Sequence, residues 1–148
     1  EGARPSVVKL RTAEPVAANA ARLGAAVLAE AEPVLILAHS KGGLEALAAL
    51  LDPAVRARCQ GFLAMQSPFY GSPVADAVME NQALGAAAGG LARLLQIGSG
   101  DGVRDLTVAA RRGWMEMRRE AVAGVLASLP VACLATVLSE ATARWTAR

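Results

Sequence analysis

Apolar and polar positions follow two periods along the chain, and these predict helices and strands in alternation. The apolar residues of Pro15–Glu30 recur at helical spacing, which predicts an amphipathic helix that Pro33 ends. The continuous apolar run Val34–Leu37 follows, and such a run is typical of a strand covered on both faces in a parallel sheet. The short β-branched segment Ser6–Leu10, before the helix, is interpreted as the end of another strand.

The same alternation continues through the rest of the chain. A leucine repeat within residues 44–51 predicts a second helix, which ends at Asp52-Pro53. The apolar runs Gly61–Met65 and Val131–Leu138 are predicted to be two more strands. Strands that alternate with helices at this spacing predict an α/β fold on a parallel sheet, and no boundary divides the chain into two domains.

The long stretch between the last two predicted strands, residues 74–127, has a helical pattern loosened by glycines. Residues 85–90 and 98–102 are glycine-rich and are expected to be flexible joints between these helices. The charge-free stretch Ala121–Ser139 is near the length of about 20 residues that a membrane span needs. Gly124 and Pro130 interrupt it, so a helix end followed by a buried strand is expected instead of a membrane span.

Composition narrows the function classes only slightly. The 148 residues are 54 % hydrophobic but only 3 % aromatic, so one domain with a core of small aliphatic side chains is expected. The net charge of +2 gives no indication of a nucleic-acid partner. No signal peptide is visible, which slightly favours the cytoplasm. Cys59 and Cys133 follow no metal or CxxC spacing and are interpreted as unpaired thiols.

The segment Ala38–Gly43 (AHSKGG) has the pattern of a nucleophile elbow, a sharp strand–turn–helix that carries a catalytic serine. Ser40 is the predicted nucleophile, and the small residues Ala38 and Gly42 stand two before and two after it, where larger side chains would collide. The backbone N–H of Lys41 is the predicted oxyanion donor, at the N-terminus of the following helix. The ammonium group of Lys41 is expected to be solvated.

A second motif, Ser67–Pro73 (SPFYGSP), directly follows the next predicted strand. With Ala38–Gly43 it resembles, in order and separation, the motifs of bacterial triacylglycerol lipases and related serine esterases of the α/β-hydrolase superfamily. The resemblance covers about Thr12–Leu138 and implies a partial α/β-hydrolase fold: a parallel sheet flanked by helices, with a helical cap inserted within residues 76–127. The whole chain, residues 1–148, is then the central part of one such domain.

The resemblance also implies an activity. It implies hydrolysis of carboxylic esters, including lipids, through an acyl-enzyme at Ser40, with no cofactor and no metal ion. A serine hydroxyl needs a general base, and the single histidine, His39, adjoins the serine and is interpreted as a packing and hydrogen-bonding residue. The catalytic histidine and acid are therefore expected outside this chain. Glu140 is a weak candidate for the acid, and Asp76 and Asp101 are weaker ones.

Two alternatives remain open at this point. The chain is either the middle of a longer hydrolase, inactive in isolation, or a non-catalytic interaction module that kept the fold. Uncovered sheet edges would favour association in both cases. The arginine-rich residues 104–119 suit an anionic partner, although interleaved acidic residues favour a solvated helical face. Trp114 and Met117 are expected to pack within the cap.

Overall fold

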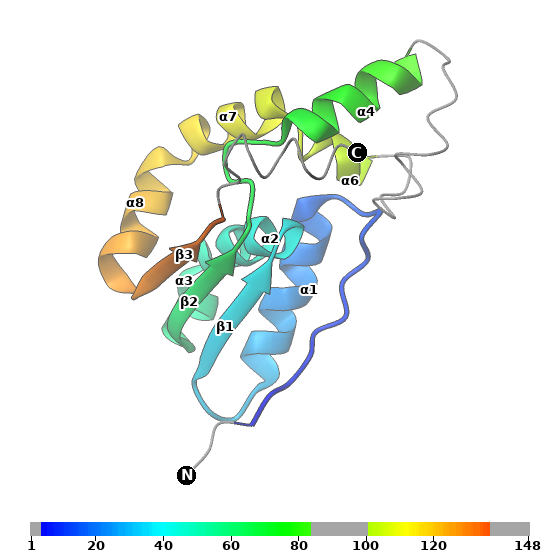
Figure 1. The fold of residues 1–148 in the computed structure, drawn as a ribbon. Coiled ribbons are helices and arrows are strands. Elements are labelled where there is room, and N and C mark those ends of the chain that lie inside the picture. The colour runs from blue at the N-terminus through cyan, green and yellow to red at the C-terminus, as the bar shows by residue number, and fades with distance from the viewer. Residues whose placement is uncertain (1–3, 84–100, 137–148) are drawn as a thin grey trace.

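The computed structural model describes residues 4–83 and 101–136, which form a three-stranded parallel sheet with helices packed against it. Figure 1 shows the arrangement, with α1 and α2 behind the sheet and α4, α6 and α7 beyond the ends of the strands. In chain order the elements are α1 (Val16–Ala29), β1 (Val34–His39), α2 (Lys41–Leu50), α3 (Pro53–Ala57), β2 (Cys59–Met65), α4 (Pro73–Ala83), α6 (Asp101–Arg104), α7 (Val108–Met117), α8 (Arg119–Ser128) and β3 (Val131–Leu134).

The strands lie in the order β1-β2-β3, and both pairings are parallel. In the register, Ile36 lies beside Phe62, and Phe62 lies beside Val131. Parallel neighbours need a crossover between them, and helices supply both crossovers here. The predicted α/β fold class, with helices flanking a parallel sheet, is confirmed.

The main hydrophobic core lies between one face of this sheet and the helices behind it. Ile36, Phe62 and Ala64 point inward from β1 and β2, and each is less than 10 % exposed. Helices α1, α2, α3 and α8 pack on this face with the following buried residues: Ala20, Leu23, Val27, Ala46, Leu47, Ala49, Leu50, Val55, Val122, Val125 and Leu129. The core holds many alanines and one phenylalanine, in line with the small aliphatic core that the composition predicts.

The opposite face of the sheet is open, contrary to the expectation of a strand covered on both faces. Leu35 is 59 % exposed and Leu37 is 62 % exposed, while Ile36 between them is buried. On β3, Leu134 is 56 % exposed on the same open face. The pattern in β1 is therefore an alternation of exposed and buried side chains, because the described residues provide helices for only one face.

Several predicted boundaries are corrected by the structure. Ser6–Leu10 is not a strand: it is an irregular and largely exposed segment with no place in the sheet. The first strand runs on to His39, two residues further than predicted, and the second begins at Cys59 instead of Gly61. The last strand ends at Leu134, and residues 137 and 138 of the predicted strand lie outside the described residues. The short helix α3 was not predicted.

Helices α4 and α6 are joined to the rest of the fold by a second, smaller core. Buried residues of α4 and of the α6 region pack against Val16 of α1 and Leu44 of α2: Ala75, Val78, Val103 and Leu106. Asp105 accepts a hydrogen bond from the backbone N–H of Val16 at 2.7 Å, which caps the N-terminus of α1. Part of the predicted joint at 98–102 is thus ordered, since Asp101 and Gly102 belong to α6; residues 85–90 lie outside the described part.

The described part of the charge-free stretch, residues 121–136, holds the end of α8 and the strand β3, as predicted. Among the residues that the structure describes, no helix has the length and apolar character needed to cross a membrane. Both cysteines are free, which confirms the prediction of unpaired thiols. Burial raises the pKa of the Cys59 thiol, whose sulfur donates to the carbonyl of Val55.

Arg111 of α7 is a charged residue buried in the interior of the protein. It is only 2 % exposed, and its guanidinium carbon lies 4.5 Å from the centre of the Trp114 ring. Its Nε and Nη2 atoms are buried without a hydrogen-bond partner. Burial lowers the pKa of Arg111, and the negative charge of Asp105 acts in the opposite direction. The arginines of this segment were predicted to be solvated, and Arg111 is the exception. The others are exposed as expected: Arg104, Arg112, Arg118 and Arg119.

We predict that Arg111→Met raises the free energy of unfolding by about 1 kcal/mol. An unpaired buried donor costs about 1–3 kcal/mol, while the cation–π contact that is lost contributes about 0.5–2 kcal/mol, so the exchange favours the methionine. Urea unfolding of both proteins measures the difference. A lower midpoint for the variant would show that the guanidinium has a partner which outweighs its desolvation.

Candidate active site

Ser40 stands at the turn between β1 and α2 with an unusual backbone conformation. Its φ is 54° and its ψ is −127°, a combination that residues other than glycine rarely adopt. Strain of this kind costs about 1–3 kcal/mol and persists only where the surroundings impose it. The surroundings do so through two hydrogen bonds: the Ser40 N–H donates to the Met65 carbonyl at 2.9 Å, and the Ser40 carbonyl accepts from the Gly43 N–H at 3.1 Å. The side chain of Ser40 is held exposed at the carboxyl end of β1.

The first turn of α2 begins immediately after this serine. The first N–H groups of a helix have no intrahelical acceptor, and the helix dipole makes this end partly positive. The backbone N–H of Lys41 is the first of these groups. A carbonyl oxygen that gained negative charge beside Ser40 would therefore meet a favourable field at this turn.

The close packing behind the turn depends on Gly43, although the sequence pattern pointed to Gly42. A Cβ atom on Gly42 would lie 3.8 Å from the Cβ of Ala38, which is an ordinary contact. A Cβ atom on Gly43 would lie 2.0 Å from Oγ and 2.6 Å from Cβ of Ser67. The glycine at 43 thus allows α2 to approach the loop that follows β2, and this loop carries the second sequence motif.

The two glycines predict opposite responses to the same substitution. Gly43→Ala is expected to lower the free energy of unfolding by about 1–3 kcal/mol, because the added methyl group overlaps Ser67. Gly42→Ala is the matched control, and it is expected to be neutral or stabilising by up to about 1 kcal/mol, because alanine favours the helix. Thermal unfolding measures both. The double variant Gly43→Ala/Ser67→Gly should recover stability, and an equal loss in both single variants would contradict this account.

The ammonium group of Lys41 is buried, contrary to the prediction that it is solvated. Lys41 is only 8 % exposed. Its Nζ donates to the carbonyl oxygen of Thr12 at 2.9 Å and also to the carbonyl oxygen of Glu14. The side chain therefore reaches from the first residue of α2 to the segment that precedes α1.

A buried carboxylate completes the environment of this ammonium group. Glu45, one helical turn further along α2 and 3 % exposed, has its Oε1 atom 3.4 Å from Lys41 Nζ. The same oxygen accepts a hydrogen bond of 2.7 Å from Nδ2 of the buried Asn19. Asn19 also bonds the backbone N–H and the carbonyl of Arg11, at 3.2 and 2.8 Å. The polar side chains are thus connected into one network across α1, α2 and the N-terminal segment.

Sequence reasoning missed Glu45 and Asn19, although a signal was present. Lys41 and Glu45 are spaced i, i+4, and Glu45 lies among the apolar residues of α2. Asn19 likewise lies on the apolar face of α1, beside Ala20. Polar residues on the buried faces of two adjacent helices indicate a paired network, because unpaired buried charges are very costly.

We predict that Lys41→Met lowers the free energy of unfolding by about 3 kcal/mol. The change leaves Glu45 as an unbalanced charge in the interior and removes the donor from two carbonyl groups. Urea unfolding measures the loss. Arg104→Met is the matched control, because its ion pair with Asp101 is about two-thirds exposed and should contribute less than about 1 kcal/mol.

A third variant tests whether the loss comes from the unbalanced charge. Lys41→Met/Glu45→Met should be more stable than Lys41→Met alone, because it removes the orphaned carboxylate. Equal losses for the lysine variant and for its exposed control would contradict the role of the buried network.

The remaining candidate residues are not brought together around Ser40. His39 is exposed at the end of β1, so it is not the packing residue that the sequence suggested. Asp76 accepts a hydrogen bond of 3.1 Å from the Val108 N–H and so caps α7. Asp101 pairs with Arg104 on the surface, and Glu140 lies outside the described residues. Both aspartates therefore have local structural roles, and neither is placed as a catalytic acid.

The loop after β2 and helix α7 are in close contact. Gly71 has a φ of 97°, and a Cβ atom there would lie 2.3 Å from the Cα of Val108, so this position of the loop requires glycine. The N–H of Ser72 donates to the carbonyl of Leu106 at 2.9 Å. Trp114, which was expected to pack within the cap, packs at the edge of the main core instead, and Met117 is 72 % exposed. Within the described residues no group of three or more histidine, cysteine or acidic side chains could hold a metal ion.

Comparison with known proteins relates the fold to that of a lipase. No family model and no curated protein matches the chain. The solved structure of the mature form of lipase BlEst2 from Bacillus licheniformis is similar, with a TM-score of 0.75 and 20 % sequence identity. The match covers 94 % of this chain and 56 % of the lipase, so the chain spans about half the length of that protein.

The propeptide form of the same lipase is also similar, with a TM-score of 0.68 and 21 % identity over 86 % of this chain and 28 % of the other. At these identities the similarity concerns the fold. The chain has a mixed α/β fold, with a parallel three-stranded sheet flanked by helices, that resembles part of a lipase.

Proposed function

We propose that the protein is a serine hydrolase of carboxylic esters and that Ser40 is its nucleophile. The observation that carries this proposal is the conformation of Ser40, with its φ of 54° at the turn from strand β1 into helix α2. A strained turn of this kind presents the serine oxygen at the top of the sheet, where a substrate can reach it. The similarity of the fold to a lipase supports an ester or a lipid as the substrate.

The proposed reaction uses the turn in two ways. The Ser40 oxygen attacks the carbonyl carbon of the ester and transfers its proton to a general base. The base returns this proton to the leaving oxygen, and the alcohol leaves as the C–O bond breaks. The Lys41 N–H donates to the carbonyl oxygen as this atom becomes negatively charged. Water then attacks the acyl-enzyme, which releases the carboxylate and restores the serine. The helices α4, α6, α7 and α8, which lie between β2 and β3 in the chain, are assigned the role of a cap over this site.

The general base is assigned to a histidine that is not among the 148 residues. His39 is the only histidine of the chain, and it is adjacent to Ser40 at the end of β1. Neighbouring side chains on such a turn point in different directions, so His39 is a poor candidate. In this proposal the histidine and the acid belong to the remainder of a hydrolase domain, and the 148 residues alone have little or no activity.

The rival function is a non-catalytic interaction module, and one observation favours it. The face of the sheet that carries Leu35, Leu37 and Leu134 is open, and large exposed apolar surfaces often mark contacts with other chains. An interaction module would keep the fold but would contain no activated serine. The two functions therefore differ in the reactivity of Ser40.

A fluorophosphonate probe separates the two functions in the protein as it occurs in its native source. We predict that the probe labels the native protein and that Ser40→Ala lowers labelling and ester turnover at least a hundredfold, because the nucleophile is lost. Ser128→Ala is the control: its hydroxyl only bonds helix carbonyls of α8, and labelling should be unchanged. Absence of labelling in the native protein would favour the interaction module. Equal labelling of Ser40→Ala would reject Ser40 as the nucleophile.

A further inference from the structure

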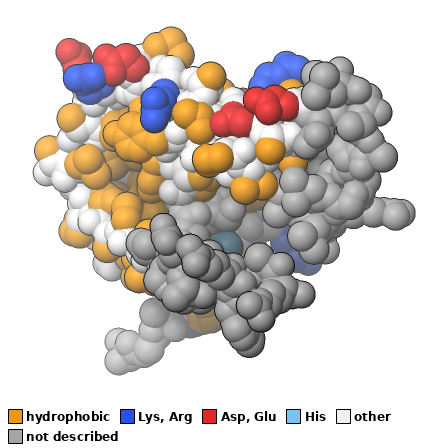
Figure 2. All heavy atoms as spheres, turned by 45° about the horizontal axis from the view of Figure 1, so that its top comes forward, with side chains coloured by type: hydrophobic (Ala, Val, Ile, Leu, Met, Phe, Trp, Pro, Cys, Tyr) orange, Lys and Arg blue, Asp and Glu red, His pale blue; other side chains and the backbone are white. Residues whose placement is uncertain are grey.

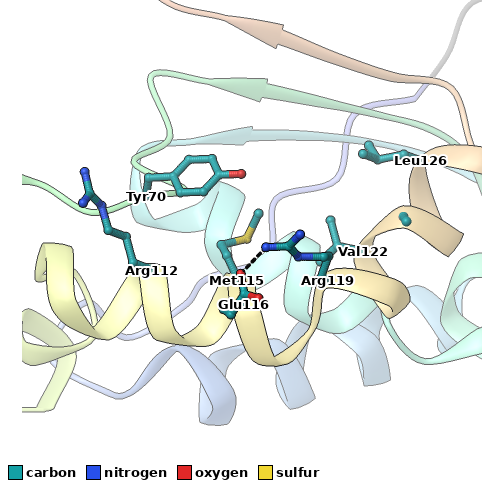
Figure 3. Close-up of a pocket in the computed structure, with 8 residues that line it drawn as sticks. Tyr70, Arg112, Met115, Glu116, Arg119, Val122 and Leu126 are labelled. Atoms are coloured by element: carbon teal, nitrogen blue, oxygen red, sulfur yellow. Dashed lines mark hydrogen bonds and ion pairs between the residues drawn. The ribbon is translucent and has the colours of Figure 1, made fainter.

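A groove of about 720 Å³ lies between the loop after β2 and the helices α7 and α8. Its size falls in the usual range for small-ligand sites, about 300–1,000 Å³. Neither Ser40 nor Lys41 lines it. Figure 3 shows the residues that do: one from the loop and the others from α7 and α8. These residues are Tyr70, Arg112, Met115, Glu116, Arg119, Val122, Ala123 and Leu126.

The floor of this groove is apolar and partly unprotected from water. Met115 of α7 and Val122, Ala123 and Leu126 of α8 form it. Leu126 is 57 % exposed, and it lies at the far end of the groove from Arg112 in Figure 3. Along α8, the seven-residue step from Arg119 to Leu126 is about 10 Å long. The floor can therefore receive an extended hydrocarbon chain that runs along α8.

Positive charge predominates on the rim of the groove. The rim has two guanidinium groups, those of Arg112 and Arg119, and one carboxylate, that of Glu116. Figure 3 shows Glu116 paired with Arg119, while Arg112 points away from them at the other end of the view. The phenol ring of Tyr70, which is 62 % exposed, lies on the opposite side, on the loop. The hydrogen bond with Glu116 raises the pKa of Arg119, with a smaller electrostatic contribution from Tyr70. The Arg119–Glu116 pair is exposed, and such pairs are weak enough for a ligand to replace.

Figure 2 shows how these features are combined on the surface. Hydrophobic side chains gather over the left part of the view, where α7 and α8 lie, and charged side chains lie among and around them. An apolar floor with an arginine rim suits a ligand that has a hydrocarbon chain and one anionic end. Arginine matches a carboxylate particularly well, because its planar group can donate two parallel hydrogen bonds.

We propose that this groove binds amphiphilic carboxylates, such as medium-chain fatty acid anions, with the carboxylate bound by Arg119 and attracted by the charge of Arg112, and with the chain along Val122 and Leu126. The inference goes beyond ester hydrolysis at Ser40, because it concerns a separate surface and rests on that surface alone. If both proposals hold, the groove would retain the carboxylate that hydrolysis releases.

Calorimetric titration of the native protein tests this assignment with three ligands of equal chain length, each below its micelle concentration. Decanoate is expected to bind at least tenfold more tightly than decanol, which lacks the charge, and than decyltrimethylammonium, which carries the opposite charge. The preference for decanoate should weaken as salt rises, because the arginines are exposed. Equal binding of all three ligands would overturn the proposal, since it would reduce the groove to a non-specific apolar surface.

Variants then assign the binding to this groove. Arg112→Gln/Arg119→Gln should raise the dissociation constant for decanoate about tenfold, and Leu126→Asp should abolish binding by placing a negative charge on the exposed floor. Arg104→Gln is the control, because Arg104 is an exposed arginine of α6 outside the groove. This variant should bind decanoate with unchanged affinity. Unchanged binding in both groove variants, or an equal loss in the control, would overturn the proposal.

Ser40→Ala separates this proposal from the proposed function. The variant should bind decanoate like the parent chain, because Ser40 does not line the groove. Loss of decanoate binding in Ser40→Ala would place the carboxylate at the elbow and would reject the groove. Loss of probe labelling with intact decanoate binding would support both proposals independently.

Discussion

The buried ammonium group of Lys41 is the constraint on which the arrangement around Ser40 depends. Its side chain binds the carbonyl groups just before α1, and its charge is balanced by Glu45 within α2. The same residue contributes the first backbone N–H of α2. Because the side chain is fixed in the interior, the main chain at this position is fixed too. A strained serine immediately before it can then persist, since the turn has no freedom to relax.

The fold could be predicted from the sequence wherever the local pattern and the tertiary environment agree. The helical period of Pro15–Glu30 gives α1 almost to the residue, and the small residues around Ser40 predict a strand–turn–helix at the correct place. The hydrophobic pattern could not predict that one face of β1 is open. A continuous apolar run such as Val34–Leu37 is compatible both with a strand covered on one face and with a strand covered on two. The tight contact of Gly43 with Ser67 was equally hidden, since it joins a helix to a loop that no periodicity relates to it.

Charged residues were the least predictable part of the candidate site. By composition alone, Lys41 and Arg111 are ordinary surface residues, yet both are buried. Their environments differ in a way that only coordinates show. Lys41 has acceptors and a counter-charge, whereas Arg111 has a tryptophan ring and two donors without partners. The first case is a completed network that holds two segments together, and the second is an interior charge whose desolvation is only partly offset.

The cap that Asp105 places on the N-terminus of α1 has a consequence for the order of folding. The carboxylate and the Val16 N–H are 89 residues apart in the sequence, so the bond closes only after most of the chain is already in position. Contacts of such high sequence separation form late, because the entropy of closing the intervening loop must be overcome first. Helix α1 can therefore form early through its own apolar face, but its first turn must fray until α6 and the residues after it have docked. Protection of the Val16 amide from hydrogen exchange would then begin only when the segment that carries Asp105, far away in the sequence, has docked.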